Sequence, residues 1–226
     1  MYYYLLLVVP ALLVAMIAQI NVKSTFRRYS RYSTAARITG AQASYMIQKA
    51  NGISVPVQPI GGELTDHYDP TRNSIGLSQP VYGADSISAV GVAAHETGHA
   101  LQYANDYAPI RFRMKLVPIT NFSATISPYL IIAGLIAGLD VLAYAGIALF
   151  SLSVLFQLVT LPVEFNASAR AVQALQASGS FTAEEMAGVR KVLTAAALTY
   201  VAALFVSLMN LLRLILIVAG RSRRND

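Results

Sequence analysis

Two long runs of apolar residues constrain the fold of this chain more than any other feature of its sequence. Tyr2–Ile20 contains no charged side chain, and Val117–Leu161, which is 45 residues long, contains only Asp140. The hydrocarbon core of a bilayer is about 30 Å thick, and a helix needs roughly 20 apolar residues to cross it. The first run therefore predicts one transmembrane helix. The second predicts two, connected by a turn at Gly138-Leu139-Asp140.

A third apolar run extends from Val192 to Ala219 and contains one charged residue, Arg213. Arg213 lies close enough to the end of this run for its guanidinium to reach the membrane surface. We therefore expect about four transmembrane helices in a mainly α, integral membrane protein. The first helix is expected to be a retained anchor, because no basic residue precedes it and no small-residue cleavage site follows it.

The composition supports a membrane protein and excludes several other classes. Apolar residues make up 55% of the chain and charged residues 12%, whereas soluble domains carry roughly 25% charged residues. This argues against a disordered chain, a soluble bundle or a nucleic-acid-binding arm. The chain has no cysteine, so a disulfide framework, a thiolate metal site and a thiol nucleophile are all excluded.

The basic residues are distributed unevenly between the segments that flank the apolar runs. Residues 21–116 contain 10 of the 17 lysines and arginines, residues 162–191 contain three, and the turn at Asp140 contains none. By the positive-inside rule, both basic segments should lie on the cytoplasmic side. The tail, with three arginines, disagrees, because four crossings place it outside, and its side of the membrane stays open.

These features divide the chain into six expected parts. They are a transmembrane anchor, a first segment outside the membrane, a two-helix transmembrane hairpin, a second segment outside the membrane, a fourth transmembrane helix and a basic tail. Their expected bounds are residues 2–20, 21–116, 117–161, 162–191, 192–219 and 220–226.

Local patterns predict the elements of the segment 21–116. A helix is expected over Tyr32–Ala50, ending at Asn51-Gly52. A small β-hairpin is expected around His67-Tyr68 and Ser74–Ser78. The second of these strands is expected to be an edge to which an extended peptide could add. The strongest helix prediction follows, from a cap at Asp85 or Ser86 to about Tyr103.

This last helix contains His95-Glu96-Thr97-Gly98-His99, the pattern HExxH. Residues four apart project from the same side of a helix, so both imidazoles can reach one ion. A catalytic zinc site has three protein ligands and an open position for water. Glu96 projects about 100° around the helix from His95 and can accept a proton from that water. The pattern therefore predicts one catalytic Zn²⁺ bound by His95 and His99, with Glu96 as the general base.

The third zinc ligand is not identified by spacing alone. Zincin sites of the two-His-one-Glu type take the Glu from a later helix, which favours Glu164. Pro162 suits the first turn of a new helix at that point, after the third transmembrane run. The other candidates are His67, Asp66, Asp69, Asp106, Glu184 and Glu185.

Several runs of the chain, taken together and in order, resemble the YugP-like family of bacterial membrane zinc metallopeptidases. These runs are DHYDP (66–70), LS (77–78), VY (81–82), AAHETGHALQ (93–102), LPVEFNASARA (161–171) and LTAAALTYVAAL (193–204). The resemblance implies a multi-pass protein of the bacterial plasma membrane. It also implies a gluzincin-type zinc site with His95, His99 and Glu164 as ligands and Glu96 as the catalytic acid.

The segment around Glu164 also resembles the heat-shock membrane proteases and the CAAX prenyl proteases. In those enzymes an Asp commonly follows the ligand Glu by four residues, whereas Ser168 stands at that position here. A carboxylate that supports a ligand His therefore cannot be assumed from this position.

His67 is a further candidate catalytic residue, because zincins use a Tyr or His near the zinc to donate to the oxyanion. A turn His in an Asp-Pro-rich hairpin is the simpler alternative for His67.

The function expected from the whole sequence is that of a membrane-integral zinc metalloendopeptidase. Residues 21–116 would be its zincin-like α+β catalytic segment and residues 162–191 a second catalytic segment. Its partners would be the lipid bilayer and peptide or membrane-protein substrates, with no nucleic acid. The alternative is a non-proteolytic membrane scaffold with a structural zinc site, in which side chains fill all four coordination positions. A transport path through Asp140 has little support, because the only other charge within the apolar runs is Arg213.

Overall fold

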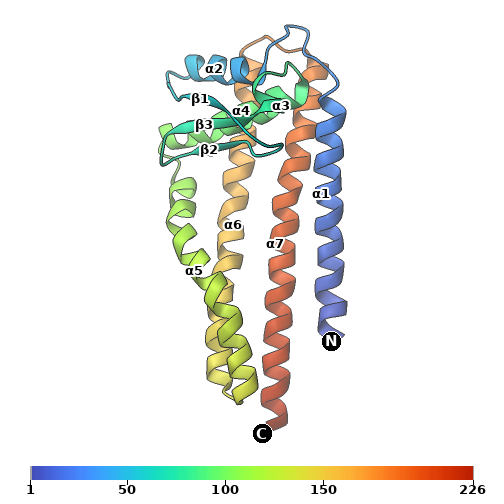
Figure 1. The fold of residues 1–226 in the computed structure, drawn as a ribbon, viewed down its shortest axis with the longest axis vertical. Helices are drawn as coiled ribbons and strands as arrows, with labels where there is room; N and C mark the ends of the chain where they lie inside the picture. The colour runs from blue at the N-terminus through green and yellow to red at the C-terminus, as the bar shows by residue number, and fades with distance from the viewer. Residues whose placement is uncertain (1, 226) are drawn as a thin grey trace. The chain divides into compact units, whose positions relative to one another are not determined.

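The computed structural model describes residues 2–225 (Figure 1). The chain divides into two compact units. The unit formed by residues 1–19, 111–161 and 199–226 is called the membrane unit, and the unit formed by residues 20–110 and 162–198 is called the sheet unit.

In residues 2–225, four helices are long and apolar enough to cross a membrane, which confirms the expected number. A π-helical turn, Tyr4–Val8, precedes the first of them. The helices are α1 (Val9–Tyr29), α5 (Ala108–Ala137), α6 (Asp140–Ala177) and α7 (Ala183–Asn225). The molecule is therefore mainly helical, as the sequence predicts.

The predicted turn between the second and third helices is present. Gly138 has a φ of +73°, a conformation that glycine adopts without steric cost. The amide of Leu139 donates to the carbonyl of Gly134 at 2.9 Å, which closes the end of α5. The chain reverses there and α6 begins at Asp140.

The membrane unit has a small apolar core and an apolar surface. Its core contains Ile131, Ala143, Ile147 and Val218. In contrast, Ile136 on α5 is 82% exposed within the chain. An apolar surface of this kind is unfavourable in water and suits contact with lipid.

The expectation that a new helix begins at Pro162 is wrong, because α6 continues through this residue as far as Ala177. Proline removes one backbone N–H donor, but its fixed φ is helical, so the cost is limited to one hydrogen bond and local crowding. The neighbours Thr160 and Val163 are buried. Packing on both sides of the proline thus favours one continuous helix.

The sheet unit contains a three-stranded sheet with the order β1-β3-β2. Strand β1 (Val57–Ile60) pairs parallel with β3 (Ser74–Ser78), and β2 (His67–Asp69) pairs antiparallel with it. The predicted hairpin is therefore present as β2 and β3. The expectation that Ser74–Ser78 is an edge strand is wrong, because β1 occupies its second side and leaves no free backbone edge there.

Helix α2 (Gly40–Ala50) is shorter than the helix predicted over residues 32–50. Thr39 accepts a hydrogen bond from the amide of Gln42, and the side chain of Gln42 accepts one from the amide of Thr39. This capping box satisfies free N–H groups of a first turn and so favours a start at Gly40. The predicted end is correct, since Asn51 caps the helix and Gly52 has a φ of +66°.

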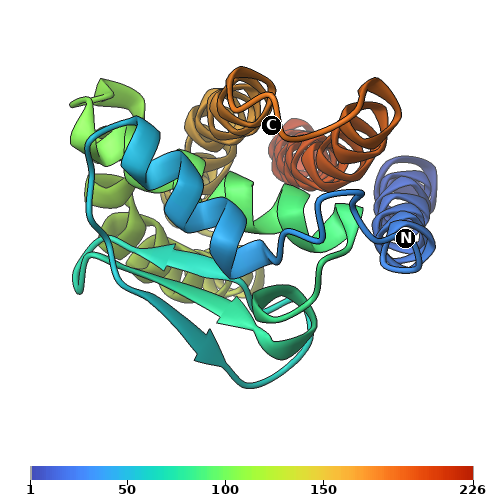
Figure 2. The same ribbon diagram turned by 90° about the horizontal axis from the view of Figure 1, so that it is seen from above.

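Helix α4 (Ile87–Ala104) has the predicted bounds and cap, with the hydroxyl of Ser86 accepting from the amide of Ala89 at 3.2 Å. A short helix, α3 (Gln79–Tyr82), precedes it. Helix α4 packs against α2 and against β2 and β3 (Figure 2). Its predicted apolar face is buried against α2, α6 and α7 in a core of the sheet unit, and consists of Ile87, Val90, Ala94 and Leu101. The HExxH residues, 95–99, lie on the same helix.

Candidate metal centre

Three of the residues predicted as ligands lie together in the sheet unit. One ligand atom each from His95, His99 and Glu164 lies within 4.8 Å of the others. Oε2 of Glu164 is 3.2 Å from Nε2 of His95 and 3.5 Å from Nε2 of His99. Among residues 2–225, this is the one group of three or more such side chains close enough to share a metal ion.

A glycine in the HExxH pattern allows α6 to approach α4 this closely. A Cβ atom built on Gly98 would lie 2.5 Å from the carbonyl oxygen of Ala167. That distance is below any real Cβ contact with a backbone atom. Gly98 therefore determines the spacing of two helices, of which one carries both histidines and the other carries Glu164.

A chain of hydrogen bonds determines which nitrogen of His99 carries its proton. Nε of Arg170 can only donate, and it lies 2.8 Å from Oδ1 of Asn166. Oδ1 of Asn166 therefore accepts, and it also accepts from Nε2 of Gln102 at 3.0 Å. The same Nε2 donates to the carbonyl of Val163 at 2.7 Å. Both partners of this nitrogen are acceptors, which identifies it as the amide nitrogen of Gln102.

The other end of this amide faces His99. Oε1 of Gln102 is 3.0 Å from Nδ1 of His99 and can only accept a hydrogen bond. Nδ1 therefore carries the proton, and the lone pair of Nε2 is directed toward Glu164. This is the tautomer that a metal-binding histidine needs when Nε2 is the ligand atom.

His95 has a matching partner on α6. Its Nδ1 lies 3.1 Å from the hydroxyl of Ser168, which can accept from the ring. Ser168 thus occupies the place that a carboxylate takes in the enzymes that the segment resembles. A neutral hydroxyl orients the ring without adding a negative charge to the site.

The site is buried and attracts positive charge. Glu164 and His99 are 2% and 8% exposed, and Glu96 is 9% exposed. Burial alone would lower the pKa of His99, but the hydrogen bond that the protonated ring makes to Glu164, and the charges of Glu96 and Glu164, outweigh this effect. The pKa of His99 consequently lies above its ordinary value of 6.5. Its surroundings therefore favour a cation at this point.

The donor set fits a zinc ion. Two imidazole nitrogens with a suitable tautomer at His99 and one carboxylate are the ligands of catalytic zinc sites that keep a position open. The outer nitrogen of each ring is already held by a protein group, as in known zinc sites. His95, His99 and Glu164 are thus a suitable set of residues to hold this metal.

The remaining candidate ligands are outside this group, and most of them have other partners. The carboxylate of Asp66 accepts from the amide and the hydroxyl of Ser78, at 2.7 and 3.0 Å. Burial raises the pKa of Asp66, against the lowering effect of these hydrogen bonds. Asp69 accepts from the amides of the turn at 71–72, and Glu185 accepts from the amides of residues 35 and 182. Glu184 and Asp106 are the other acidic candidates outside the group.

His67 is also outside the group. It lies exposed on β2, and its Nδ1 is 2.9 Å from the carbonyl oxygen of Thr65. Strand β2 packs against α4, where the ring of Tyr68 lies 5.4 Å from that of Tyr103. The strand that carries His67 therefore neighbours the HExxH helix.

Sequence reasoning did not identify the supporting roles of Gln102, Asn166 and Ser168. Helical spacing contains a signal for two of them, because Gln102 follows His99 by three residues and Ser168 follows Glu164 by four. Gln102 contacts His99 on its own helix, but it is oriented by Val163 and Asn166 of α6, and the partner of Ser168 is His95 of α4, so these pairs require the tertiary structure.

Comparisons with known proteins identify the family of this chain. The family described as "Putative neutral zinc metallopeptidase" matches residues 4–219. The chain is 48% identical over 215 residues to the "Putative membrane protease YugP" of Bacillus subtilis (strain 168), covering 95% of this chain and 96% of that protein. No solved structure matches the chain. With its four apolar helices and this relative, the chain is a multi-pass membrane protein, and it belongs to this family of zinc metallopeptidases.

Proposed function

We propose that this protein is a membrane-integral zinc metalloendopeptidase of the gluzincin type. The observation that carries the proposal is the group formed by His95, His99 and Glu164, with Glu96 next to His95 on the same helix. The proposed ligands of one Zn²⁺ are the two histidines and Glu164. When bound, zinc would lower the pKa of water and polarise the carbonyl of the scissile peptide bond.

Glu96 is proposed to be the general base. Its carboxylate takes a proton from the water as the oxygen attacks the carbonyl carbon, and later gives it to the leaving amine. Gln102 and Ser168 keep the two imidazole rings in their orientations during these steps. Hydrolysis then needs no covalent intermediate between substrate and enzyme.

His67 is proposed to donate a hydrogen bond to the oxyanion as water attacks. Its exposure, and the packing of β2 against α4, support this role. His67→Ala should lower kcat at least about tenfold and leave the zinc content unchanged. Equal kcat in the two proteins would exclude this role.

The proposed arrangement has catalytic segments at residues 21–116 and 162–191, on the cytoplasmic side of a bacterial plasma membrane. The proposed membrane spans are one helix at residues 2–20, two helices at residues 117–161 and one helix at residues 192–219. A basic tail follows at residues 220–226. The excess of basic residues in the two catalytic segments supports this orientation. Substrates would be peptides or membrane proteins cleaved near the bilayer surface.

The experiment that tests the proposal compares Glu96→Gln and Glu164→Ala with the wild type, by elemental analysis and by cleavage of a denatured membrane protein. Glu96→Gln should keep zinc and lose activity by a factor of about 10³ or more. Glu164→Ala should lose both zinc and activity. Cleavage by Glu96→Gln at the wild-type rate would refute the mechanism. A zinc ion with four side-chain ligands in X-ray absorption would instead identify a structural site in a scaffold.

A further inference from the structure

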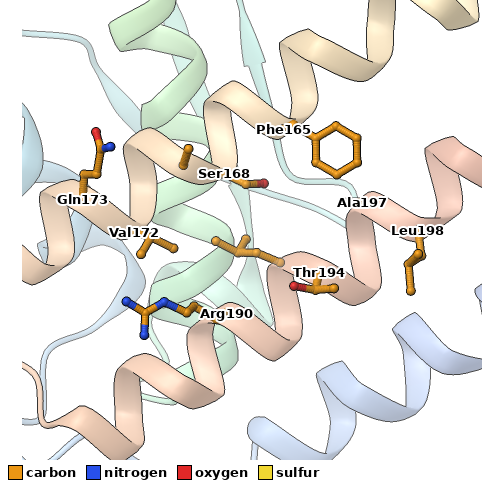
Figure 3. A pocket seen from close by; sticks show the side chains of 10 residues that line it. Phe165, Ser168, Val172, Gln173, Arg190, Thr194, Ala197 and Leu198 are labelled. Carbon is orange, nitrogen blue, oxygen red and sulfur yellow. The ribbon is translucent and has the colours of Figure 1, made fainter.

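A groove lies beside the proposed metal centre, between α6 and α7 within the sheet unit (Figure 3). Its volume is about 370 Å³, which is near the lower end of the range for ligand pockets and sufficient for one or two side chains. The side chains that line it come only from these two helices. They are Phe165, Ser168, Ala169, Val172, Gln173, Arg190, Leu193, Thr194, Ala197 and Leu198.

The two ends of the groove differ in chemistry (Figure 3). Phe165, Ala197 and Leu198 form one end, and Gln173 and Arg190 form the other. This polarity follows from the chain, because α6 and α7 are connected by a short turn at residues 178–182 and therefore run antiparallel here. The groove thus has an apolar half and a half with one positive charge.

The positive charge in this half of the groove belongs to Arg190, whose guanidinium can bind an acidic group. Its side chain is exposed, and in the described part of the chain no acidic side chain lies within ion-pair distance of it. An exposed guanidinium beside an apolar groove can bind a carboxylate of a ligand, and its planar shape favours two parallel hydrogen bonds.

Ser168 connects the groove to the metal centre. Its side chain lines the groove, and its hydroxyl lies 3.1 Å from Nδ1 of His95. A group that fills the groove is therefore separated from a proposed zinc ligand by one side chain. This proximity is the reason to consider the groove as a place for a substrate residue close to the scissile bond.

We propose that the groove binds a substrate segment next to the scissile bond, with a large apolar side chain in the half near Phe165 and Leu198 and an acidic side chain at Arg190. This inference rests on the proposed function and specifies its substrate class. The eight helical steps from Arg190 to Leu198 rise about 12 Å, and an extended peptide advances about 3.3 Å per residue. The acidic residue should therefore follow or precede the apolar one by two to four positions.

The test measures peptide binding, so that it does not depend on catalysis. The Glu96→Gln protein, purified in detergent with zinc and immobilised, is incubated with a library of random decapeptides, and retained peptides are identified by mass spectrometry. Two further substitutions are made in this background: Thr194→Phe, which fills the groove, and Arg190→Glu, which reverses its charge. Ala187→Phe and Lys191→Glu are matched controls, because both positions are exposed on α7 and do not line the groove.

The expected result is that retained peptides are enriched in an apolar and an acidic residue at the stated spacing. Thr194→Phe should reduce retention of these peptides about tenfold or more, since it removes the burial of one large side chain. Arg190→Glu should change the enriched charge from acidic to basic, and both controls should match the parent. Purified wild-type protein should then cleave the retained peptides.

Three outcomes would overturn the inference. These are no retained peptide, retention that Thr194→Phe and Arg190→Glu leave unchanged, and a co-purified lipid that is lost specifically in Thr194→Phe. If the groove variants change retention as expected but the wild type does not cleave the retained peptides, the groove assignment stands and the proposed function fails. If cleavage occurs and depends on Glu96 while the groove variants have no effect, the proposed function stands and the groove assignment fails.

Discussion

The membrane unit and the sheet unit differ in whether their buried hydroxyl groups have hydrogen-bond partners. In the described part of the chain, the buried hydroxyls without a hydrogen-bond partner belong to Thr120, Ser123 and Ser127, all in the membrane unit. In the sheet unit, the fully buried hydroxyl of Ser44 lies 2.7 Å from that of Thr97 and accepts from Nε2 of Gln48 at 3.2 Å. Buried hydrogen bonds thus contribute to the packing of the sheet unit, whereas these three hydroxyls of the membrane unit contribute none.

The proposed metal site gives a physical reason for this difference. It places ionisable groups in a buried position, and such groups are tolerated only when hydrogen bonds orient and satisfy them. Helices in lipid satisfy their backbone internally and need few polar side chains. The two units therefore differ in which substitutions they should tolerate.

The largest effect is expected for Gly98→Ala, which should destabilise the sheet unit by about 2 kcal/mol or more. The added methyl would overlap the carbonyl of Ala167 and force α4 and α6 apart. Zinc content should fall as well, because Glu164 moves with α6. Thermal unfolding and elemental analysis measure both effects.

The matched control is Gly91→Ala on the same helix, whose Cβ would meet Val189 at an ordinary 3.6 Å. It should stabilise the protein by up to about 1 kcal/mol through helix propensity. Equal stability of the two variants would show that the close approach of α4 and α6 is not needed.

Gln102→Leu should weaken zinc binding by about 10- to 100-fold, because Nδ1 of His99 loses its acceptor. The carbonyl of Val163 also loses a donor, which should cost roughly 1–3 kcal/mol of stability. Competition with a chelator measures the affinity. Gln176→Leu, at an exposed position of α6, is the control and should leave zinc affinity unchanged. Unaltered affinity in Gln102→Leu would contradict the tautomer assigned to His99.

The pair Ser44→Ala and Ser127→Ala tests the contrast between the units directly, because both side chains are 0% exposed. Ser44→Ala leaves the amide of Gln48 without an acceptor in a buried place and should cost about 1 kcal/mol or more. Ser127→Ala removes a hydroxyl that has no partner and should change stability by less than about 0.5 kcal/mol, or increase it. Unfolding in detergent with increasing denaturant compares them. A greater loss for Ser127→Ala would reverse the contrast.

The smallest effect is expected for substitution of Asp85, which should change how the stability of the protein depends on pH in the acidic range. Hydrogen bonds from Ser33 and Arg37 hold the pKa of Asp85 below its ordinary value of 3.8. The stability contributed by this carboxylate is present above pH 3.8 and is lost as the pH falls through its lower folded pKa. Asp85→Asn should therefore show a shallower loss of stability below about pH 4.

The pKa of Asp66 is shifted in the opposite direction to that of Asp85, because burial raises it. Its protonation favours the folded state as the pH falls, so Asp66→Asn should make the acid loss steeper. Melting temperatures between pH 3 and 6 distinguish the two variants, and parallel curves would contradict both assignments.

Several features follow from the sequence alone because they depend on neighbours along the chain. Apolar length predicts the four helices, and Gly138 predicts the turn between α5 and α6. The spacing of His95 and His99 places both imidazoles on one side of α4. The cap at Ser86 and the stop at Asn51 are likewise local hydrogen bonds.

Other features depend on which segments meet, and only the tertiary structure decides them. The sequence favours Glu164 among several acids without placing it in space, and the close approach of α6 to α4 at Gly98 and Ala167 brings it to the histidines. Pro162 resembles a helix start in the sequence, but buried neighbours keep α6 continuous, and β1 joins β3 at the side predicted to be free. Local patterns encode single elements, whereas these outcomes depend on packing energies between elements that are distant in the chain.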